Sequence, residues 1–325
     1  MGQRTVAVVG LLAIFAAGPT LAQTRDLTGV WTNTTITPLE RGRNQPNLVV
    51  SAEEAQRIAR SNPLVRRTEE DAKPSDLSKN ILADGNTVNG YNAGWMDWGS
   101  QLSQVKGEYR TSWVVEPADG RIPVTEAAQG ADRRSAARQR DTRGPEAMAP
   151  NDRCLIGSRG SGGPGMLNNL YNNTYQIVQA KDHVVIVVEM VHDARIVPIH
   201  ASKSAAQAAH RPSAIPVWLG DSVGWWEGNQ LVVESVNIHP EQGGYGPIYL
   251  SPQGKVTERF ERVSPTEIYY AFEVEDPVFY SRPWRAETTL RANEGNIYEY
   301  ACHEGNYAME GMLSGARLEE RTAAR

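Results

Sequence analysis

The chain has 325 residues, with 38 acidic and 33 basic side chains and 40% hydrophobic residues. That hydrophobic content is too high for a disordered chain and sufficient for a globular one. The formal charge of −5 argues against a nucleic-acid-binding surface, which needs concentrated basic side chains. We therefore expect no nucleic-acid partner.

Residues 1–22 are predicted to be a secretory signal peptide. Arg4 is their only charged residue, an apolar run covers 6–17, and the small residues of 20–22 suit a cleavage site. The run is too short to span a membrane stably, and no other apolar run approaches 18 residues. We expect residues 23–325 to form one β-rich domain, exported to the periplasm or secreted, without a stable membrane span.

The first half of the mature chain mixes short elements with polar loops. A strand is predicted at 26–34, a helix at 51–60 with Ser51 as its N-cap, and a strand at 110–116. Residues 61–94 are predicted to form a long surface segment, and residues 126–149 an exposed helix or a mobile linker. We expect 35–170 to be partly an insertion or a second layer.

Residues 157–165 form a glycine-rich segment, predicted to be a flexible loop and a possible lid. They do not follow a strand with the spacing of a nucleotide site, so phosphate binding is not expected.

From residue 171 onward the sequence is dominated by short Val-, Ile-, Tyr- and Thr-rich segments separated by turn residues. Their spacing, without long helices between them, favours an antiparallel meander. The predicted fold is mainly β, a barrel or lipocalin-like structure with a few short helices and long loops, and 171–325 supply the main meander. The predicted strands are 174–179, 183–191, 194–199, 223–226, 231–237, 254–263, 267–274, 284–292 and 297–303.

The two cysteines, Cys154 and Cys302, are predicted to form a disulfide because the expected compartment is oxidising. Two buried free thiols are the alternative.

One polar cluster interrupts a buried strand and is the first candidate catalytic site. It contains Glu189, His192, Asp193 and Arg195. We expect His192 to act as a general base oriented by Asp193 or Glu189, and Arg195 to bind substrate and stabilise an oxyanion. The structural alternative is a salt bridge from Arg195 to Asp193 or Glu189.

A second cluster ends the predicted strand at 297–303. His303 is the expected general acid, with Tyr171 as its alternative, and Glu304 and Tyr307 are expected to bind substrate. A capping histidine is the structural alternative. Glu189, His192, His303 and Glu304 could also hold zinc or manganese, although neighbouring strand residues point to opposite faces. No cofactor is expected, with this divalent metal site as the alternative.

Four further residues complete the predicted substrate site. Asn173 offers an amide, Asp221 and Trp225 a carboxylate beside an aromatic platform, and Arg282 a guanidinium. Each also has a structural interpretation, as a turn former, a core side chain or an ion-pair partner.

The sequence resembles a widespread family of secreted bacterial proteins, usually called hypothetical, that has no settled activity. The shared motifs are DLTGVW (26–31), DGRIP (119–123), YNNTYQIVQ (171–179), EMVHDARI (189–196), WLGDSVGWWEG (218–228) and YEYACHEGNY (298–307). In addition, Gly29-Val30-Trp31 is similar to the Gly-x-Trp of the first lipocalin strand, which implies a barrel with a small apolar ligand in its mouth.

These features predict an exported, cofactor-independent enzyme that uses His, Asp and Glu for acid–base chemistry. The reaction would be that of a lyase, isomerase or hydrolase on a small aromatic, terpenoid or carbohydrate-like substrate. The alternatives are a periplasmic lipocalin-like binding protein for an apolar or aromatic ligand and a metal-dependent hydrolase.

Overall fold

A computed structural model describes residues 25–71, 96–138, 141–157 and 160–323. Three predicted features lie wholly or partly outside the described residues: the signal peptide, most of the long surface segment at 61–94, and residues 158–159 of the glycine-rich segment.

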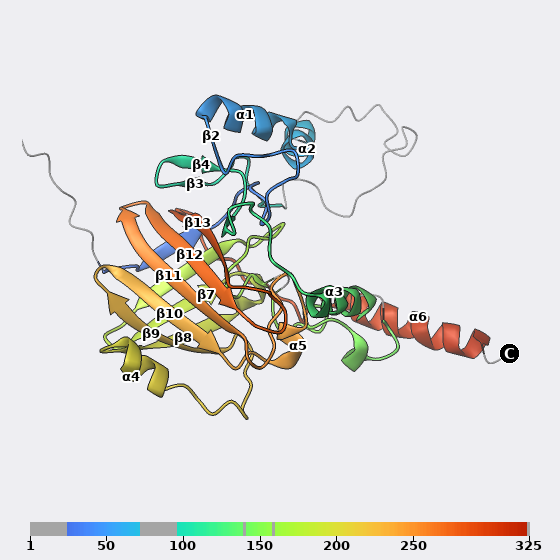
Figure 1. The fold of residues 1–325 in the computed structure, drawn as a ribbon. Coiled ribbons are helices and arrows are strands. Elements are labelled where there is room, and N and C mark those ends of the chain that lie inside the picture. Colours follow the sequence, from blue (N-terminus) through green and yellow to red (C-terminus); the bar gives the residue numbers. More distant parts are fainter. Residues whose placement is uncertain (1–24, 72–95, 139–140, 158–159, 324–325) are drawn as a thin grey trace, which may run out of the picture.

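Nine strands close into a barrel, which confirms the predicted mainly-β fold (Figure 1). The first strand closes it by pairing with both the second and the last, at Trp31–Tyr175 and Trp31–Ala292. The predicted strands 174–179 and 284–292 have the observed bounds. The strands are β1 (Gly29–Thr32), β6 (Thr174–Gln179), β7 (His183–Val188), β8 (Ala194–His200), β9 (Asp221–Glu227), β10 (Gln230–Val236), β11 (Lys255–Ser264), β12 (Glu267–Glu275) and β13 (Trp284–Ala292).

One pair of strands departs from the predicted antiparallel meander. β8 and β9 run parallel, with Ile199 opposite Gly224. Parallel neighbours need a crossover connection, and residues 201–220, including α4 (Lys203–Ala208), supply it.

The prediction of a strand at 297–303 is wrong. These residues have no strand structure, and the backbone N–H of Tyr298 donates to Glu189 Oε1 over 3.1 Å. The pairing of β13 with β1 has already closed the barrel, so no sheet edge remains beside β13 for a further strand at this point.

Alternation along the strands fills the barrel interior with side chains. In β7 the buried residues are Val184, Ile186 and Val188, and in β12 they include Tyr270 and Phe272. The fully buried side chains on the barrel strands also include the rings of Trp31, Tyr175, Phe260 and Trp284. The interior is therefore a packed core.

A second, three-stranded sheet lies against the outside of the barrel, in the order β2 (Val49–Val50), β4 (Glu108–Arg110) and β3 (Gln104–Val105). The predicted strand 110–116 is thus divided between two sheets, because β5 (Val114–Glu116) pairs with β13 instead.

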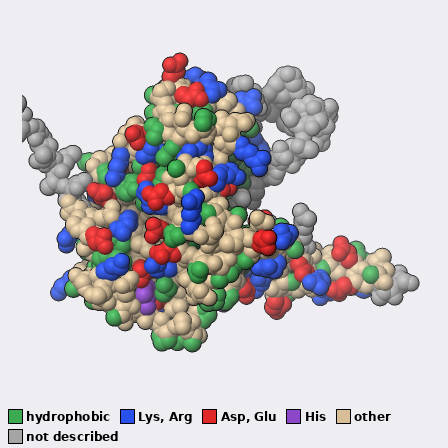
Figure 2. Space-filling view, in the orientation of Figure 1, with side chains coloured by type: hydrophobic (Ala, Val, Ile, Leu, Met, Phe, Trp, Pro, Cys, Tyr) green, Lys and Arg blue, Asp and Glu red, His purple; other side chains and the backbone are tan. Residues whose placement is uncertain are grey.

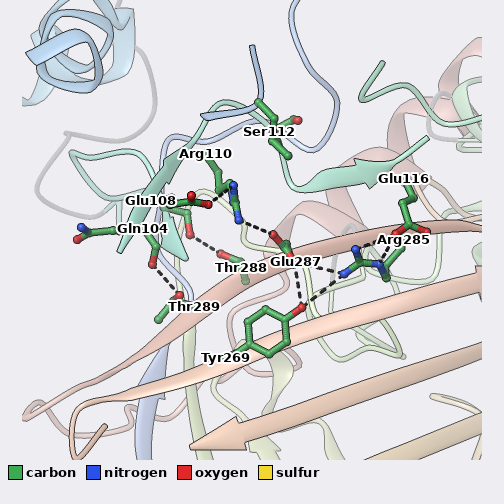
Figure 3. A network of polar contacts seen from close by, with 12 residues as sticks. Gln104, Glu108, Arg110, Ser112, Glu116, Tyr269, Arg285, Glu287, Thr288 and Thr289 are labelled. Carbon is green, nitrogen blue, oxygen red and sulfur yellow. Dashed lines mark hydrogen bonds and ion pairs between the residues drawn. The ribbon is translucent and has the colours of Figure 1, made fainter. Parts of the chain in front are cut away.

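Glu287 fastens this small sheet to the barrel, as Figure 3 shows. Its Oε1 lies 3.0 Å from Arg110 Nη2 of β4, and its Oε2 accepts a 2.9 Å hydrogen bond from Tyr269 of β12. Arg285 joins the same carboxylate over 3.3 Å and extends the network to Glu116 of β5. The carboxylate is almost fully buried and has a cationic partner on each side.

The helices lie outside the barrel (Figure 1). The helix predicted at 51–60 is confirmed as α1 (Ala52–Ser61), and Ser51 accepts from the Glu54 N–H as its N-cap. The others are α2 (Pro63–Asp71), α3 (Glu126–Arg138), α5 (Pro240–Gly243) and α6 (Tyr307–Ala323). No helix within the described residues has the length and apolar character needed to cross a membrane.

The predicted disulfide between Cys154 and Cys302 is confirmed, with Cα atoms 5.8 Å apart. It attaches the segment before α6 to the loop that precedes the glycine-rich segment. Asn306 supports the same attachment, since its Nδ2 donates to Asp152 O over 2.9 Å. No helix is predicted after this segment, but α6 begins at Tyr307 and projects from the body (Figure 1).

Candidate functional site

The barrel interior contains one layer of polar side chains. Five neighbouring strands, β8 to β12, each contribute one residue: Arg195, Ser222, Ser235, Glu258 and Tyr270. Arg195 forms a two-point ion pair with Glu258, with Nη1 and Oε1 3.1 Å apart. Tyr270 donates to the same Oε1 over 2.6 Å, and burial raises the pKa of Tyr270 well above its usual value.

The described part of the glycine-rich loop closes this end of the barrel. Gly165 N–H donates to Glu258 Oε1 over 3.2 Å, and Met166 N–H to the Tyr270 hydroxyl over 2.8 Å. A Cβ placed on Gly163 would come within 2.5 Å of Arg195 Nη1, so only glycine allows this approach. Residues 161–167 are buried and plug this end of the barrel, where the sequence predicts a flexible loop and possible lid at 157–165.

The plug leaves little room for a ligand at the mouth. The cavity beside Gly162, Pro164 and Ile248 has a volume of about 30 Å³, enough for water only. Arg195, predicted to bind substrate, is buried behind the plug, where its two Nη atoms pair with Glu258 and not with Asp193 or Glu189.

Apart from Arg195, the first predicted catalytic cluster lies on a tight turn between β7 and β8. Val191 and His192 have positive φ values, 58° and 40°, so the residues do not continue the β7 strand as expected. His192 is exposed. Asp193 Oδ2 accepts from Gly157 N–H over 2.8 Å, and burial raises the pKa of Asp193 to about 6.

The second predicted cluster lies beside the first. Glu189 of the first cluster is buried and accepts a hydrogen bond from Tyr298 N–H, which lies just before the second cluster. Both clusters also contact the loop at 152–157: the first through Asp193, and the second through Asn306 and the disulfide. His303 and Glu304 are exposed in a turn, and Tyr307 at the start of α6 is 82% exposed. The structure thus brings the two segments together, but it shows no contact between the His192 and His303 side chains.

Within the described residues, no group of three or more His, Cys, Asp or Glu side chains is placed to hold a metal ion. The divalent metal alternative therefore gains no support from the positions of Glu189, His192, His303 and Glu304.

Three predicted substrate-binding residues lie apart from these clusters. Asp221, at the start of β9, accepts from His210 Nδ1 over 2.9 Å and from Arg211 N–H over 2.7 Å. Trp225 is buried under α4 beside Ala206 and donates to Glu227. Arg282 is exposed in the loop before β13.

Asn173 and Tyr171 belong to the turn that enters β6. Asn173 is 1% exposed, and its side chain bonds to backbone groups only in the hydrogen bonds that we describe. Its Nδ2 donates to Asp97 O over 2.6 Å and to Asn169 O over 2.9 Å, and its Oδ1 accepts from Asn169 N–H over 2.6 Å. Its role here is to brace the turn. Tyr171 stacks on Tyr300 with ring centroids 6.5 Å apart and lines a second cavity.

That cavity is a groove of about 770 Å³ outside the barrel, which we call the aromatic groove. Segments far apart in the sequence form it: the chain after β1, the α1–α2 junction, α3, the loop after the plug and the loop after α5. Five rings line it, together with amides and hydroxyls. The rings belong to Trp98, Trp113, Tyr171, Tyr245 and Tyr249, and the polar residues are Thr35, Thr37, Asn62, Asp132, Ser135, Asn168 and Asn169.

Asp132 and Tyr249 form the acidic part of the groove wall. The Tyr249 hydroxyl donates to Asp132 Oδ1 over 2.8 Å. Burial, and next the hydrogen bond to Asp132, raise the pKa of Tyr249, which keeps the phenol protonated. Tyr249 is buried, whereas Asp132 is exposed and belongs to the groove lining.

Asp132, Tyr249, Trp98 and Trp113 are not among the site residues predicted from the sequence. The only local signal was the accumulation of Tyr, Gly and Pro at 245–249, which reads as an ordinary turn. Asp132 lies on α3, whose sequence mixes charged and small residues, a pattern typical of a solvent-exposed helix.

Comparison of the chain with protein-family models, with curated proteins and with solved structures found no match.

Proposed function

We propose that this protein binds a small organic molecule with at least one planar ring in the aromatic groove. The observation that carries the proposal is the groove itself, about 770 Å³ with five rings and several amides and hydroxyls in its walls. Ligand sites are typically concave, largely apolar and supplied with a few polar groups that orient the ligand. The binding site lies outside the barrel, since core side chains and the plug fill the interior.

The nature of the surface agrees with a small ligand. Figure 2 shows acidic and basic side chains intermixed over the face in view, without a broad region of one sign.

The test uses a unique thiol to fill the groove. Leu170 lines the groove and is 47% exposed, and the sequence holds two cysteines, which are bonded to each other. Leu170→Cys can therefore be labelled selectively with biphenyl maleimide. Ile215→Cys is the matched control, because Ile215 is 54% exposed and lies outside the groove lining.

N-phenylnaphthylamine, whose fluorescence rises when it leaves water, is the binding probe. We expect wild type and labelled Ile215→Cys to bind it alike, and labelled Leu170→Cys to lose at least tenfold in affinity. Equal binding by both labelled variants, or no binding by wild type, overturns the proposal.

Acid–base catalysis by the His192 turn is the second candidate. Its support is that the pKa of Asp193 is raised to about 6 and that the neighbouring His192 is exposed. Side chains with a strongly shifted pKa are common at catalytic sites. A panel of naphthyl esters and epoxides would be assayed with His192→Ala and His303→Ala. Loss of turnover in both, with unchanged melting temperatures, is expected; full activity in both excludes this candidate.

Export to an oxidising compartment remains part of the proposal, and the Cys154–Cys302 disulfide supports it. Alkylation of the protein taken directly from cells should find no free thiol.

A further inference from the structure

We infer that the aromatic groove selects a cationic ligand, an organic amine or other ammonium attached to an apolar group. This inference rests on the proposed function, because it concerns the charge preference of the same groove.

The first observation is an unbalanced charge. Among the described residues that line the groove, Asp132 alone has a formally charged side chain. No Lys, Arg or His belongs to this lining. Arg134 on the same helix is near enough to lower the pKa of Tyr249, but it does not line the groove.

The second observation is the orientation of the carboxylate. Tyr249 donates to one oxygen, Oδ1, and this hydrogen bond fixes the carboxylate at the groove wall. A charge held in place in this way binds an ammonium N–H donor better than a freely rotating one, because less side-chain entropy is lost.

The third observation is the chemistry of the walls. The faces of Trp and Tyr rings attract cations through the ring quadrupole, and cages of such rings are a known means of recognising ammonium groups. Tyr171 and Tyr245, the partly exposed rings of the lining, therefore complement the same charge that Asp132 would neutralise. An anionic ligand would meet this carboxylate without a compensating cation from the lining.

Three probes with one ring system separate charge from shape: naphthylmethylamine, naphthylmethanol and naphthoate. Calorimetric titration of wild type should give the order amine, alcohol, acid, with the amine about tenfold tighter than the alcohol, which is the size of effect expected for a charge-assisted hydrogen bond near the surface. Asp132→Asn retains the shape of the side chain and should remove the preference. Glu126→Gln, on the exposed face of the same helix, should retain it.

The outcomes distinguish the inference from the proposed function. If amine and alcohol bind wild type equally, or if Asp132→Asn keeps the preference, the cation selectivity is wrong while ring binding in the groove stands. If none of the probes binds wild type, or if labelled Leu170→Cys binds them unchanged, the proposed function fails, and the inference with it.

Discussion

Arg195 and Glu258 form an ion pair inside the barrel although their strands, β8 and β11, are not neighbours in the sheet; the two side chains are 1% and 0% exposed. The pair spans the interior and is completed by Tyr270, Ser222, Ser235 and the plug backbone. It connects opposite parts of the barrel and gives the plug its hydrogen-bond partners.

Removing the charge of Glu258 should strongly destabilise the fold. Glu258→Gln leaves the Arg195 guanidinium buried without a counter-ion, and breaking a buried pair on one side typically costs about 3–5 kcal/mol. Urea denaturation would measure this loss. Glu261→Gln is the control on the same strand, since Glu261 forms a 3.8 Å pair with Lys106, and a surface pair of this kind is worth about 0–1 kcal/mol. Similar losses in both variants would contradict a structural role for the pair.

Gly163→Ala should displace the plug. Gly163 has φ +81°, and an added Cβ would lie 2.5 Å from Arg195 Nη1. Gly107→Ala is the control, since φ is +87° there but no atom lies within 4 Å. We expect the control to lose about 1–2 kcal/mol from the left-handed conformation alone, and Gly163→Ala to lose clearly more in the same denaturation assay. Equal losses would show that the plug does not rest on Arg195.

Asp193 should make the stability depend on pH. Its folded-state pKa is raised to about 6 from 3.8, so the folded protein holds this proton more tightly than the unfolded chain. The stabilisation, about 2–3 kcal/mol at most, is complete below pH 4 and is lost as the pH rises through 6.

Asp193→Asn isolates this effect, because the amide oxygen can still accept from Gly157 N–H. From pH 4 to pH 7, the unfolding free energy of wild type should fall relative to that of Asp193→Asn. A constant difference over this range would show that the carboxyl is not protonated preferentially in the fold.

Breaking the disulfide should loosen the C-terminal attachment. Cys154→Ser with Cys302→Ser removes a link between positions 148 residues apart, and losses of about 2–5 kcal/mol are usual for a native disulfide. Limited proteolysis should then cut first in the segment 293–306, before the barrel strands. Unchanged protection of this segment would mean that Asn306 and Glu189 hold it without the disulfide.

The sequence alone was sufficient for features that depend on neighbouring residues. The composition of 174–179 and 284–292, rich in residues that favour strands, together with the turn residues around them, identified β6 and β13. Ser51 and Glu54 marked the start of α1, because the cap acts three residues along the chain. The disulfide followed from two cysteines and the expected compartment.

The tertiary structure decided everything that depends on contacts between distant segments. Residues 297–303 have a strand-like composition, yet β13 already pairs with β1, and a strand needs a free edge. Arg195 stands two residues from Asp193 but pairs with Glu258, 63 residues away, because alternation turns Arg195 into the interior. The aromatic groove joins segments from Thr35 to Tyr249, and no local pattern encodes a surface formed only by packing.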